Sequence, residues 1–133
     1  MTPLDTVTAI YDAFTRGDIA TIVGFMDDDV AWTTTTRSTP HPWMQPQHGP
    51  AGVAAFFAAV HDHVHLDVFA PGVPCVSGSM VLAPVHEQAT LLATGKQTPP
   101  YLTVHVWEFG ANGKVTRFQL ISDWAMQEEA VRP

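Results

Sequence analysis

Residues 101–124, YLTVHVWEFGANGKVTRFQLISDW, decide the fold. Two runs rich in Val, Ile, Thr and aromatic residues flank Asn112-Gly113, a pair that tolerates positive φ at both positions and is typical of a β-hairpin turn. We therefore predict a long hairpin. One register gives chemically compatible cross-strand partners along its length: Glu108 with Arg117, Trp107 with Phe118, His105 with Leu120, Thr103 with Ser122, and Tyr101 with Trp124.

This register divides the side chains of the hairpin between two faces. The first face is apolar with a few polar groups and carries Tyr101, Thr103, His105, Trp107, Phe118, Leu120, Ser122 and Trp124. The second face is apolar in its middle, where it carries Leu102, Val104, Val106 and Ile121. A sheet that is apolar on both faces must be covered twice. We therefore predict a homodimer in which a second copy of the chain covers the outer face.

Length, composition and charge limit the class of protein. The 133 residues predict one domain, 1–133, that is large enough to bury a hydrophobic core. No apolar run approaches the roughly 20 residues of a membrane-spanning helix, and no signal peptide is evident, so we expect a cytoplasmic protein without a membrane partner. The net charge of −7 and the six scattered Lys and Arg argue against a nucleic-acid partner, because phosphate binding needs clustered cations.

Capping and spacing patterns predict three helices in the first half of the chain. TPLD at residues 2–5 is typical of a helix start, Gly17 of a helix end, and Asp18 of the cap of a second helix. Apolar residues at helical spacing predict a third helix over 51–64. Residues 30–36 predict a strand and residues 66–98 two more, with Pro84 indicating an edge strand or a bulge. The tail after residue 124 is expected to be exposed.

The segment 37–50, RSTPHPWMQPQHGP, differs in kind from its neighbours. Its prolines argue against regular structure, and Trp43 and Met44 are too apolar for a plain linker. We interpret the segment as a lid beside a pocket. The alternative is a surface loop that packs on its own residues.

Two groups of residues resemble metal ligands. His61 and His65 have the spacing of a helical zinc pair, but no third ligand accompanies them, and histidines near a helix carboxyl end interact favourably with its dipole. The adjacent acids at 27–29 lack the spacers and glycine of a calcium loop and are typical of a solvated turn. We predict no metal site.

The order of these elements, together with three segments of sequence, resembles the NTF2-like superfamily and in particular its SnoaL-like and ketosteroid-isomerase-like branch. The segments are YDAFTRGDIATIVGFMDDDVAW, HGPAGVAAFF and HVWEFGANGKVTRFQLISDW. The resemblance implies an α+β conical barrel in which three N-terminal helices pack on a curved antiparallel β-sheet and enclose an apolar pocket. It also implies a dimer formed through the outer sheet surface.

The catalytic residues of the isomerases carry over only in part. Ile10 stands where those enzymes have a catalytic tyrosine, with Tyr11 one step round the helix, so the oxyanion donor is lost at that position. Thr34 stands where they have a proton-shuttling aspartate and does not act as a base near neutral pH. Their second pocket acid corresponds to His105, which the hairpin register independently places on the pocket face. Asp123 would face His105 only if a bulge rotated it inward.

Two hypotheses for function follow. In the first, the protein is a small-molecule-binding protein with an apolar pocket for a small or polycyclic ligand, and His105 is a core histidine. In the second, it is an isomerase, cyclase or lyase that uses His105 as its proton carrier. Neither hypothesis requires a cofactor. The expected pocket residues are Tyr11, Trp32, Thr34, Trp43, Phe56, Phe57, Thr103, Trp107, Phe118, Leu120 and Ser122.

Overall fold

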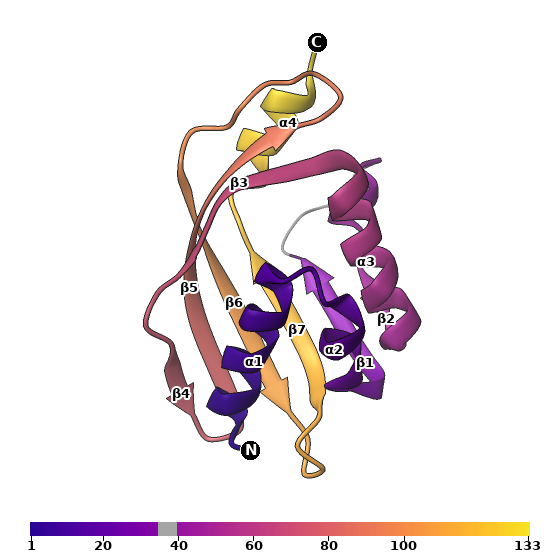
Figure 1. Cartoon of the computed structure of the whole chain (residues 1–133), viewed down its shortest axis with the longest axis vertical. Coiled ribbons are helices and arrows are strands. Elements are labelled where there is room, and N and C mark those ends of the chain that lie inside the picture. Colours follow the sequence, from indigo (N-terminus) through magenta and orange to yellow (C-terminus); the bar gives the residue numbers. More distant parts are fainter. Residues whose placement is uncertain (35–39) are drawn as a thin grey trace.

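The computed structural model describes residues 1–34 and 40–133, which form helices on one face of a twisted sheet (Figure 1). The elements are α1 (Pro3–Thr15), α2 (Ile19–Gly24), β1 (Met26–Thr34), the 3-10 turn η1 (Pro42–Met44), β2 (Gln47–His48), α3 (Gly49–His63), β3 (Val64–Pro71), β4 (Cys75–Ser77), β5 (Met80–Leu91), β6 (Tyr101–Phe109), β7 (Val115–Ile121) and α4 (Trp124–Val131). In Figure 1, α1, α2 and α3 cover the sheet, and α4 lies at the end where the chain terminates.

The sheet is mixed and open. Its strand order is β2-β1-β7-β6-β5-β3, with β4 also paired to β5. The fold class predicted from sequence, helices packed on a curved sheet, is confirmed. The sheet differs from the expected antiparallel one because β1 runs parallel to β7, its neighbour in the middle of the sheet. The chain also contains a fourth helix, α4, in addition to the three that were predicted.

The predicted hairpin is present as β6 and β7. His105 pairs with Leu120, Trp107 with Phe118, and Glu108 with Arg117, as the sequence predicted. The predicted pairs of Thr103 with Ser122 and of Tyr101 with Trp124 do not form. The reason is that β7 ends at Ile121 and α4 begins at Trp124.

The turn of the hairpin also differs from the expectation. Gly113 has a φ of 78°, as expected. Asn112 does not have positive φ, because among the described residues only glycines do. The backbone N–H of Gly113 donates to the carbonyl of Gly110, and an irregularity after the Glu108 pair adds one residue to β7. This is a turn followed by a glycine in the left-handed region, which is the alternative to two residues with positive φ.

The first two helices begin at the predicted caps. The Thr2 side chain accepts from the Asp5 backbone while the Asp5 carboxylate accepts from the Thr2 backbone, and the Asp18 carboxylate caps α2 by accepting from the backbone N–H and the hydroxyl of Thr21. The acids at 27–29 form the start of β1 and not a turn. The Asp27 carboxylate accepts from the Asp29 backbone and from the side chain of Asn112, which ties β1 to the hairpin turn.

The third helix ends earlier than a zinc pair would need. α3 stops at His63 and β3 starts at Val64, so His61 and His65 do not share a helical face. The His65 ring instead contacts the Asp67 carboxylate at 2.9 Å. Within residues 1–34 and 40–133, no group of His, Cys, Asp and Glu side chains is arranged to hold a metal ion.

Residues 64–91 form three strands where two were expected. β5 lies between β6 and β3 and is not an edge strand, and its pairing with β6 continues through Pro84 without a register shift, so neither the edge strand nor the bulge predicted from Pro84 is present. Pro84 is tolerated because its backbone faces the gap between β3 and β4, where its carbonyl accepts from Gly72. Pro84 therefore interrupts no ladder of inter-strand hydrogen bonds, because the chain that would pair with it lies in the break between β3 and β4.

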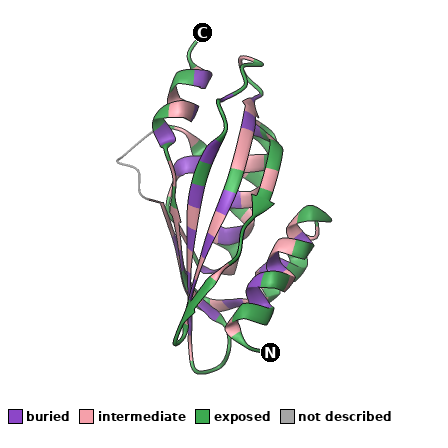
Figure 2. Cartoon of the chain, turned by 90° about the vertical axis from the view of Figure 1, so that its left-hand side faces the viewer, coloured by how far each residue is buried: buried purple, intermediate pink, exposed green. Residues whose placement is uncertain are grey.

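The carboxyl-terminal tail is a helix that belongs to the core. Trp124, Gln127 and Ala130 of α4 are buried, which corrects the expectation of an exposed tail, and Figure 2 shows buried positions recurring along this helix. Trp124 and Ala130 join a second hydrophobic cluster that includes Trp43 and Met44. A first, larger cluster lies under α1, α2 and α3.

The part of the sequence predicted as a lid is described from residue 40 onward, and 37–39 lie outside the described residues. It holds a 3-10 turn and the short strand β2, where no regular element was expected. Trp43 and Met44 are buried against α4 and β5, so this half of the segment is packed in the fold. Lid motion stays a prediction. In the described residues, no helix is both long and apolar enough to cross a membrane.

The hairpin turn predicts a matched pair of substitutions. Gly113→Ala places a Cβ in the left-handed region and should lower the free energy of unfolding by about 1 kcal/mol, although no atom lies within 4 Å of that Cβ. Gly24→Ala is the control, because Gly24 also has nothing within 4 Å but does not have positive φ. Urea unfolding of both variants measures the difference. Equal stability of the two would show that the turn does not require glycine.

A polar relay in an apolar pocket: candidate functional site

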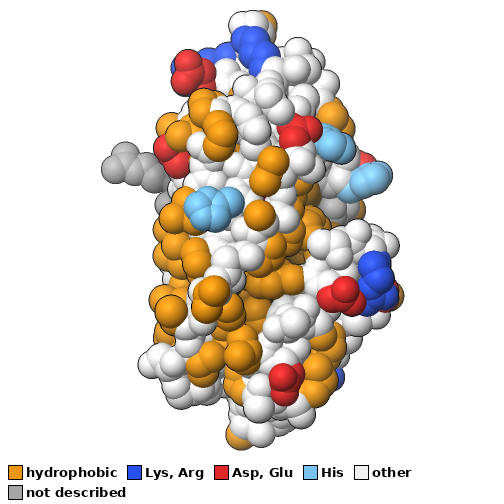
Figure 3. Space-filling model, turned by 60° about the vertical axis from the view of Figure 1, so that its left-hand side comes forward, with side chains coloured by type: hydrophobic (Ala, Val, Ile, Leu, Met, Phe, Trp, Pro, Cys, Tyr) orange, Lys and Arg blue, Asp and Glu red, His pale blue; other side chains and the backbone are white. Residues whose placement is uncertain are grey.

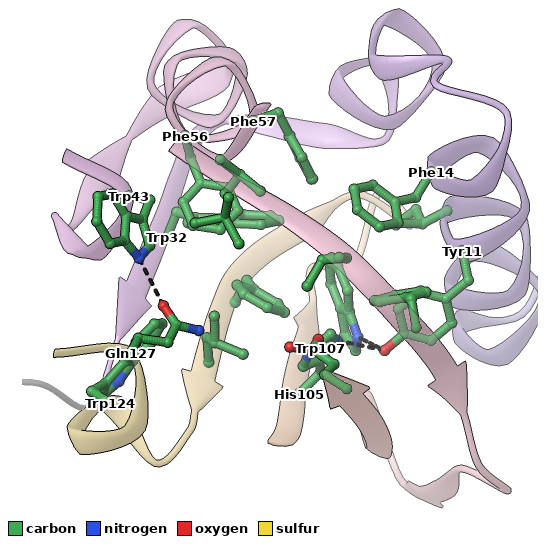
Figure 4. A pocket seen from close by; sticks show the side chains of 18 residues that line it. Tyr11, Phe14, Trp32, Trp43, Phe56, Phe57, His105, Trp107, Trp124 and Gln127 are labelled. Atoms are coloured by element: carbon green, nitrogen blue, oxygen red, sulfur yellow. Dashed lines mark hydrogen bonds and ion pairs between the residues drawn. The ribbon is translucent and has the colours of Figure 1, made fainter. Parts of the chain in front are cut away.

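A pocket lies between the two hydrophobic clusters, under α1 and α3 and beside α4 (Figure 4). It encloses about 690 Å³ that is not filled by atoms, including its opening to solvent. The lining comes from both clusters, with α1, α3, β1, β3, β5, β6, β7, η1 and α4 each contributing at least one side chain.

The structure brings most of the expected pocket residues together. The expected residues that line the pocket are Tyr11, Trp32, Trp43, Phe56, Phe57, His105, Trp107, Phe118 and Leu120. Aromatic rings form much of the wall, with Trp32 stacked on Phe118 at 4.0 Å between ring centroids and Trp107 at 4.4 Å from the same ring. The wall is therefore largely apolar and aromatic.

Three expected hydroxyl groups do not line the pocket. Thr34 donates to the Met44 carbonyl and Thr103 to the Val85 carbonyl, so both hydroxyls bind backbone. Ser122 lies beyond the end of β7, where its hydroxyl is buried without a hydrogen-bond partner in the described residues. Asp123 is exposed at the start of α4 and does not turn toward His105.

Glu87 of β5 is the main pocket residue that the hairpin did not reveal. Its side chain is 10% exposed and lines the pocket. The sequence did hold a signal, because Val81, Ala83, Val85, Ala89 and Leu91 alternate as buried residues and Glu87 falls in phase with them. A charged residue on the buried side of an alternating strand points to a site.

Glu87, His105 and Tyr11 form the polar centre of the pocket. The Tyr11 hydroxyl lies 2.9 Å from His105 Nδ1 and accepts from the indole N–H of Trp107 at 3.1 Å (Figure 4). His105 Nε2 lies 4.0 Å from Glu87 Oε2. Glu87 pairs with Tyr101 and His105 with Ala83, so the two long side chains reach toward each other over the short ones of Val85 and Thr103.

A second set of polar side chains lies near Glu87. Tyr101 is the cross-strand partner of Glu87, and its hydroxyl opposes the effect of burial on the pKa of the carboxyl. The Gln127 amide donates to the Tyr101 oxygen at 3.1 Å, and the Gln127 carbonyl accepts from the Trp43 indole at 2.7 Å. Polar side chains thus connect α4 to α1 across the floor of the pocket.

Burial sets the protonation states at this centre. Burial raises the pKa of Glu87 to about 7, with a smaller opposing effect of the Tyr101 hydroxyl. Burial lowers the pKa of His105 to about 3, so the ring is neutral at pH 7. It also raises the pKa of Tyr11. The contact between Glu87 and His105 has ion-pair distance but is not an ion pair at neutral pH, because the imidazole carries no charge there.

The pocket has no fixed positive charge. No lysine or arginine is among the described side chains that line it, and Glu87 is the one lining residue in this part of the chain that can become an anion near pH 7. A carboxylate that ionises near neutral pH beside a neutral imidazole is suited to acid/base work, because its proton is easily both lost and regained.

The chain belongs to the family of SnoaL-like domains, whose family model matches residues 7–118. Among solved structures it is similar to an NTF2-like protein of unknown function from Burkholderia pseudomallei, at 27% identity, full coverage of both chains and a TM-score of 0.88. A second NTF2-like protein, from Burkholderia thailandensis, is 21% identical, with coverage of 100% and 99% and a TM-score of 0.87.

A putative SnoaL-like polyketide cyclase from Mesorhizobium loti is more distant. It is 19% identical over 90% of this chain and 98% of its own, with a TM-score of 0.73. No curated protein matches the sequence. The chain is therefore a SnoaL-like domain with the NTF2-like fold.

The family comparison bears on Tyr11. Ile10 lines the pocket but is apolar, and the phenol oxygen that reaches the polar centre belongs to Tyr11. A hydroxyl therefore reaches the polar centre from α1 at the residue after Ile10. His105, by contrast, lies on the pocket face of β6, as the hairpin register indicated.

The raised pKa of Glu87 predicts a titration that can be observed directly. In protein labelled with ¹³C at the glutamate carboxyls, the signal that disappears in Glu87→Gln should titrate at about pH 7. Glu108→Gln is the matched control, since Glu108 pairs with Arg117 on the outer face. A Glu87 signal that titrates near its ordinary value of 4.5 would contradict the buried, cation-free environment.

The same shift predicts a dependence of stability on pH. The carboxyl ionises more easily in the unfolded chain, with an ordinary pKa of 4.5, than in the fold, where the pKa is about 7. Stability from this group is therefore complete below pH 4.5 and lost as pH rises to 7, by about 3 kcal/mol at most. Glu87→Gln should flatten the stability curve between these values. An unchanged slope in urea unfolding across this range would be evidence against the shift.

Proposed function

We propose that this protein binds a small, neutral, largely aromatic or polycyclic ligand and transfers a proton between Glu87 and an oxygen of that ligand, without a cofactor. The observation that carries the proposal is a buried carboxyl with a pKa near 7 that contacts a neutral imidazole in an otherwise apolar pocket. Burial of a carboxyl without a cation costs stability, so such a group is more often functional than structural.

The pocket supports a neutral ligand. Its wall is made of aromatic and aliphatic side chains, and no lysine or arginine of the described part lines it. An anionic ligand would lose its hydration without gaining a counter-charge, and it would be repelled by ionised Glu87. The polar atoms that remain, on Tyr11, His105 and Glu87, suit a ligand with a hydroxyl or carbonyl oxygen.

The donors and acceptors of Glu87, His105 and Tyr11 provide a route for the proton. When Glu87 is ionised, the Tyr11 hydroxyl donates to His105 Nδ1 and the Nε2 proton is directed at the carboxylate. When Glu87 is protonated, it donates to Nε2, and Nδ1 carries the ring proton and donates to the Tyr11 oxygen. The Tyr11 proton is then free for a ligand oxygen.

Every proton is accounted for in this transfer. Glu87 gives its proton to Nε2, Nδ1 gives its own to Tyr11, and Tyr11 gives its own to the ligand oxygen. The imidazole changes tautomer and ends neutral, which agrees with the lowered pKa of His105. The 4.0 Å between Nε2 and the carboxyl is longer than a hydrogen bond, so transfer requires the Glu87 side chain to approach by about 1 Å.

Ligand binding can be measured by intrinsic fluorescence, because all four tryptophans of the chain line the pocket. We expect 2-naphthol and naphthalene to quench this fluorescence saturably at pH 7, and 2-naphthoate to bind at least tenfold more weakly, because its charge has no partner. Phe57→Ala should weaken binding of both neutral probes. Tighter binding of the naphthoate than of the naphthol would overturn the assignment of a neutral ligand.

Proton transfer can be tested on an enolisable ketone. We expect the wild-type protein to accelerate deuterium uptake by 2-tetralone in D₂O, since the relay delivers a proton to the carbonyl oxygen while a C–H proton leaves to water. Tyr11→Phe, His105→Ala and Glu87→Gln should each reduce the acceleration by roughly 10²-fold, and Glu108→Gln should not. Full activity in His105→Ala would contradict the relay, and absence of any acceleration by the wild-type protein would leave a binding protein.

The homodimer and the cytoplasmic location expected from sequence remain proposals. Support for the dimer comes from the outer face of the sheet, where Leu102 is 49% and Ile121 40% exposed. Figure 3 shows hydrophobic side chains gathered over one side of the molecule, with the charged groups mainly at its edges. Leu102→Glu should shift the sedimentation coefficient to that of a monomer, whereas Leu92→Glu, at the turn after β5, should not.

A further inference from the structure

Gln127 is a polar residue of the pocket that the proton relay does not use. It comes from α4, is 5% exposed and lines the pocket. Figure 4 shows it with Trp43 and Trp124 on the side of the pocket opposite Tyr11. A buried amide is costly unless its donors and its acceptor are satisfied, so the partners of Gln127 indicate what this side of the pocket can bind.

The orientation of the Gln127 amide is fixed by its neighbours. The Trp43 indole donates and never accepts, so the amide oxygen must face Trp43, at 2.7 Å from the indole nitrogen. The NH₂ group then donates to the Tyr101 phenol oxygen at 3.1 Å. The Trp43 ring itself stacks with His41 at 5.0 Å and with His63 at 5.2 Å between ring centroids, which holds its N–H in place. The amide therefore cannot exchange its oxygen and nitrogen without losing the bond to Trp43.

This side of the pocket holds more donors than acceptors. An amide nitrogen carries two hydrogens, and within residues 1–34 and 40–133 only the Tyr101 oxygen accepts one of them. The indole nitrogen of Trp124 is buried and, in the same part of the chain, has no hydrogen-bond partner. The Gln127 oxygen is already bound by Trp43. The ligand group that complements these donors is an oxygen that accepts a hydrogen bond and has no proton of its own to place.

We propose that Gln127 donates to a second oxygen of the ligand, a carbonyl or ether oxygen, and so selects ligands that carry an acceptor at the α4 side besides the oxygen that meets Tyr11. This inference rests on the proposed function, since it places the same neutral ligand in the same pocket. Gln127 bonds Tyr101 and Tyr11 bonds His105. Tyr101 and His105 are four residues apart on β6, roughly 13 Å along the strand. The two oxygens therefore belong at opposite ends of a fused ring system and not on adjacent carbons.

The experiment compares two neutral probes of the same shape. In 6-acetyl-2-naphthol a ketone lies at the far end of the rings from the hydroxyl, and in 6-isopropenyl-2-naphthol a C=CH₂ group replaces its C=O. Titration calorimetry with the full chain at pH 6 measures both affinities without using tryptophan fluorescence. We expect the wild-type protein to bind the ketone roughly fivefold more tightly, because the ketone oxygen accepts from the buried Gln127 amide.

Two substitutions test whether this preference comes from the amide. Gln127→Met keeps the length of the side chain and removes the donor, so the isopropenyl probe should bind at least as tightly as the ketone, which then loses its hydration without gaining a bond. Trp43→Phe removes the indole N–H that orients the amide, and it should reduce the preference for the ketone. Gln97→Met, at an exposed glutamine that does not line the pocket, is the matched control and should keep the wild-type preference.

The outcomes separate this inference from the proposed function. Equal affinity of the wild-type protein for the two probes would overturn the inference and leave the neutral-ligand pocket intact. A ketone preference that persists in Gln127→Met and disappears in Tyr11→Phe would also overturn it, because the ketone would then lie at Tyr11. Failure of the wild-type protein to bind either probe would instead contradict the proposed function. Near-ultraviolet circular dichroism establishes that each variant is folded, and the wild-type preference together with Trp43→Phe decides the matter if Gln127→Met is not.

Discussion

The pocket depends on the register in which β5, β6 and β7 pair. Side chains alternate between the two faces of a strand, so a slip of one residue turns each of them to the opposite face. In the observed register, Glu87 of β5 and Tyr101, His105 and Trp107 of β6 all face the helices. The same register gives the sheet an apolar outer face. One constraint on pairing therefore determines both the chemistry of the pocket and the surface available to a second subunit.

The buried carboxyl of Glu87 is where stability and function oppose each other. A leucine at this place in β5 would continue the alternation of apolar residues and would avoid the loss of hydration. The fold instead places neutral polar groups near the carboxyl, the His105 ring at 4.0 Å and Tyr101 as the cross-strand partner. This arrangement holds the group close to the midpoint of its titration, where small changes at the imidazole or the ligand shift the proton.

The local part of the structure could be predicted from sequence, and the non-local part could not. The pairing of His105 with Leu120 and of Trp107 with Phe118 depends on a short turn, so the sequence determines it almost alone. The pairing of Glu87 with Tyr101 depends on a longer connection with no comparable turn signal, so the acid of the pocket was missed. α4 was missed because its apolar residues are interspersed with Gln127, Glu128 and Glu129, and its packing depends on Trp43 and its neighbours, which are distant in sequence.

The central claim concerns where protons lie, and neutron diffraction locates them. Crystals of the deuterated protein would be measured at pD values below and above the Glu87 midpoint. The account predicts deuterium on Glu87 and on His105 Nδ1 at the lower pD, and on Nε2 with an ionised carboxylate at the higher pD. A doubly protonated His105 beside an ionised Glu87 at the lower pD would contradict it, because the centre would then be an ion pair and not a neutral relay.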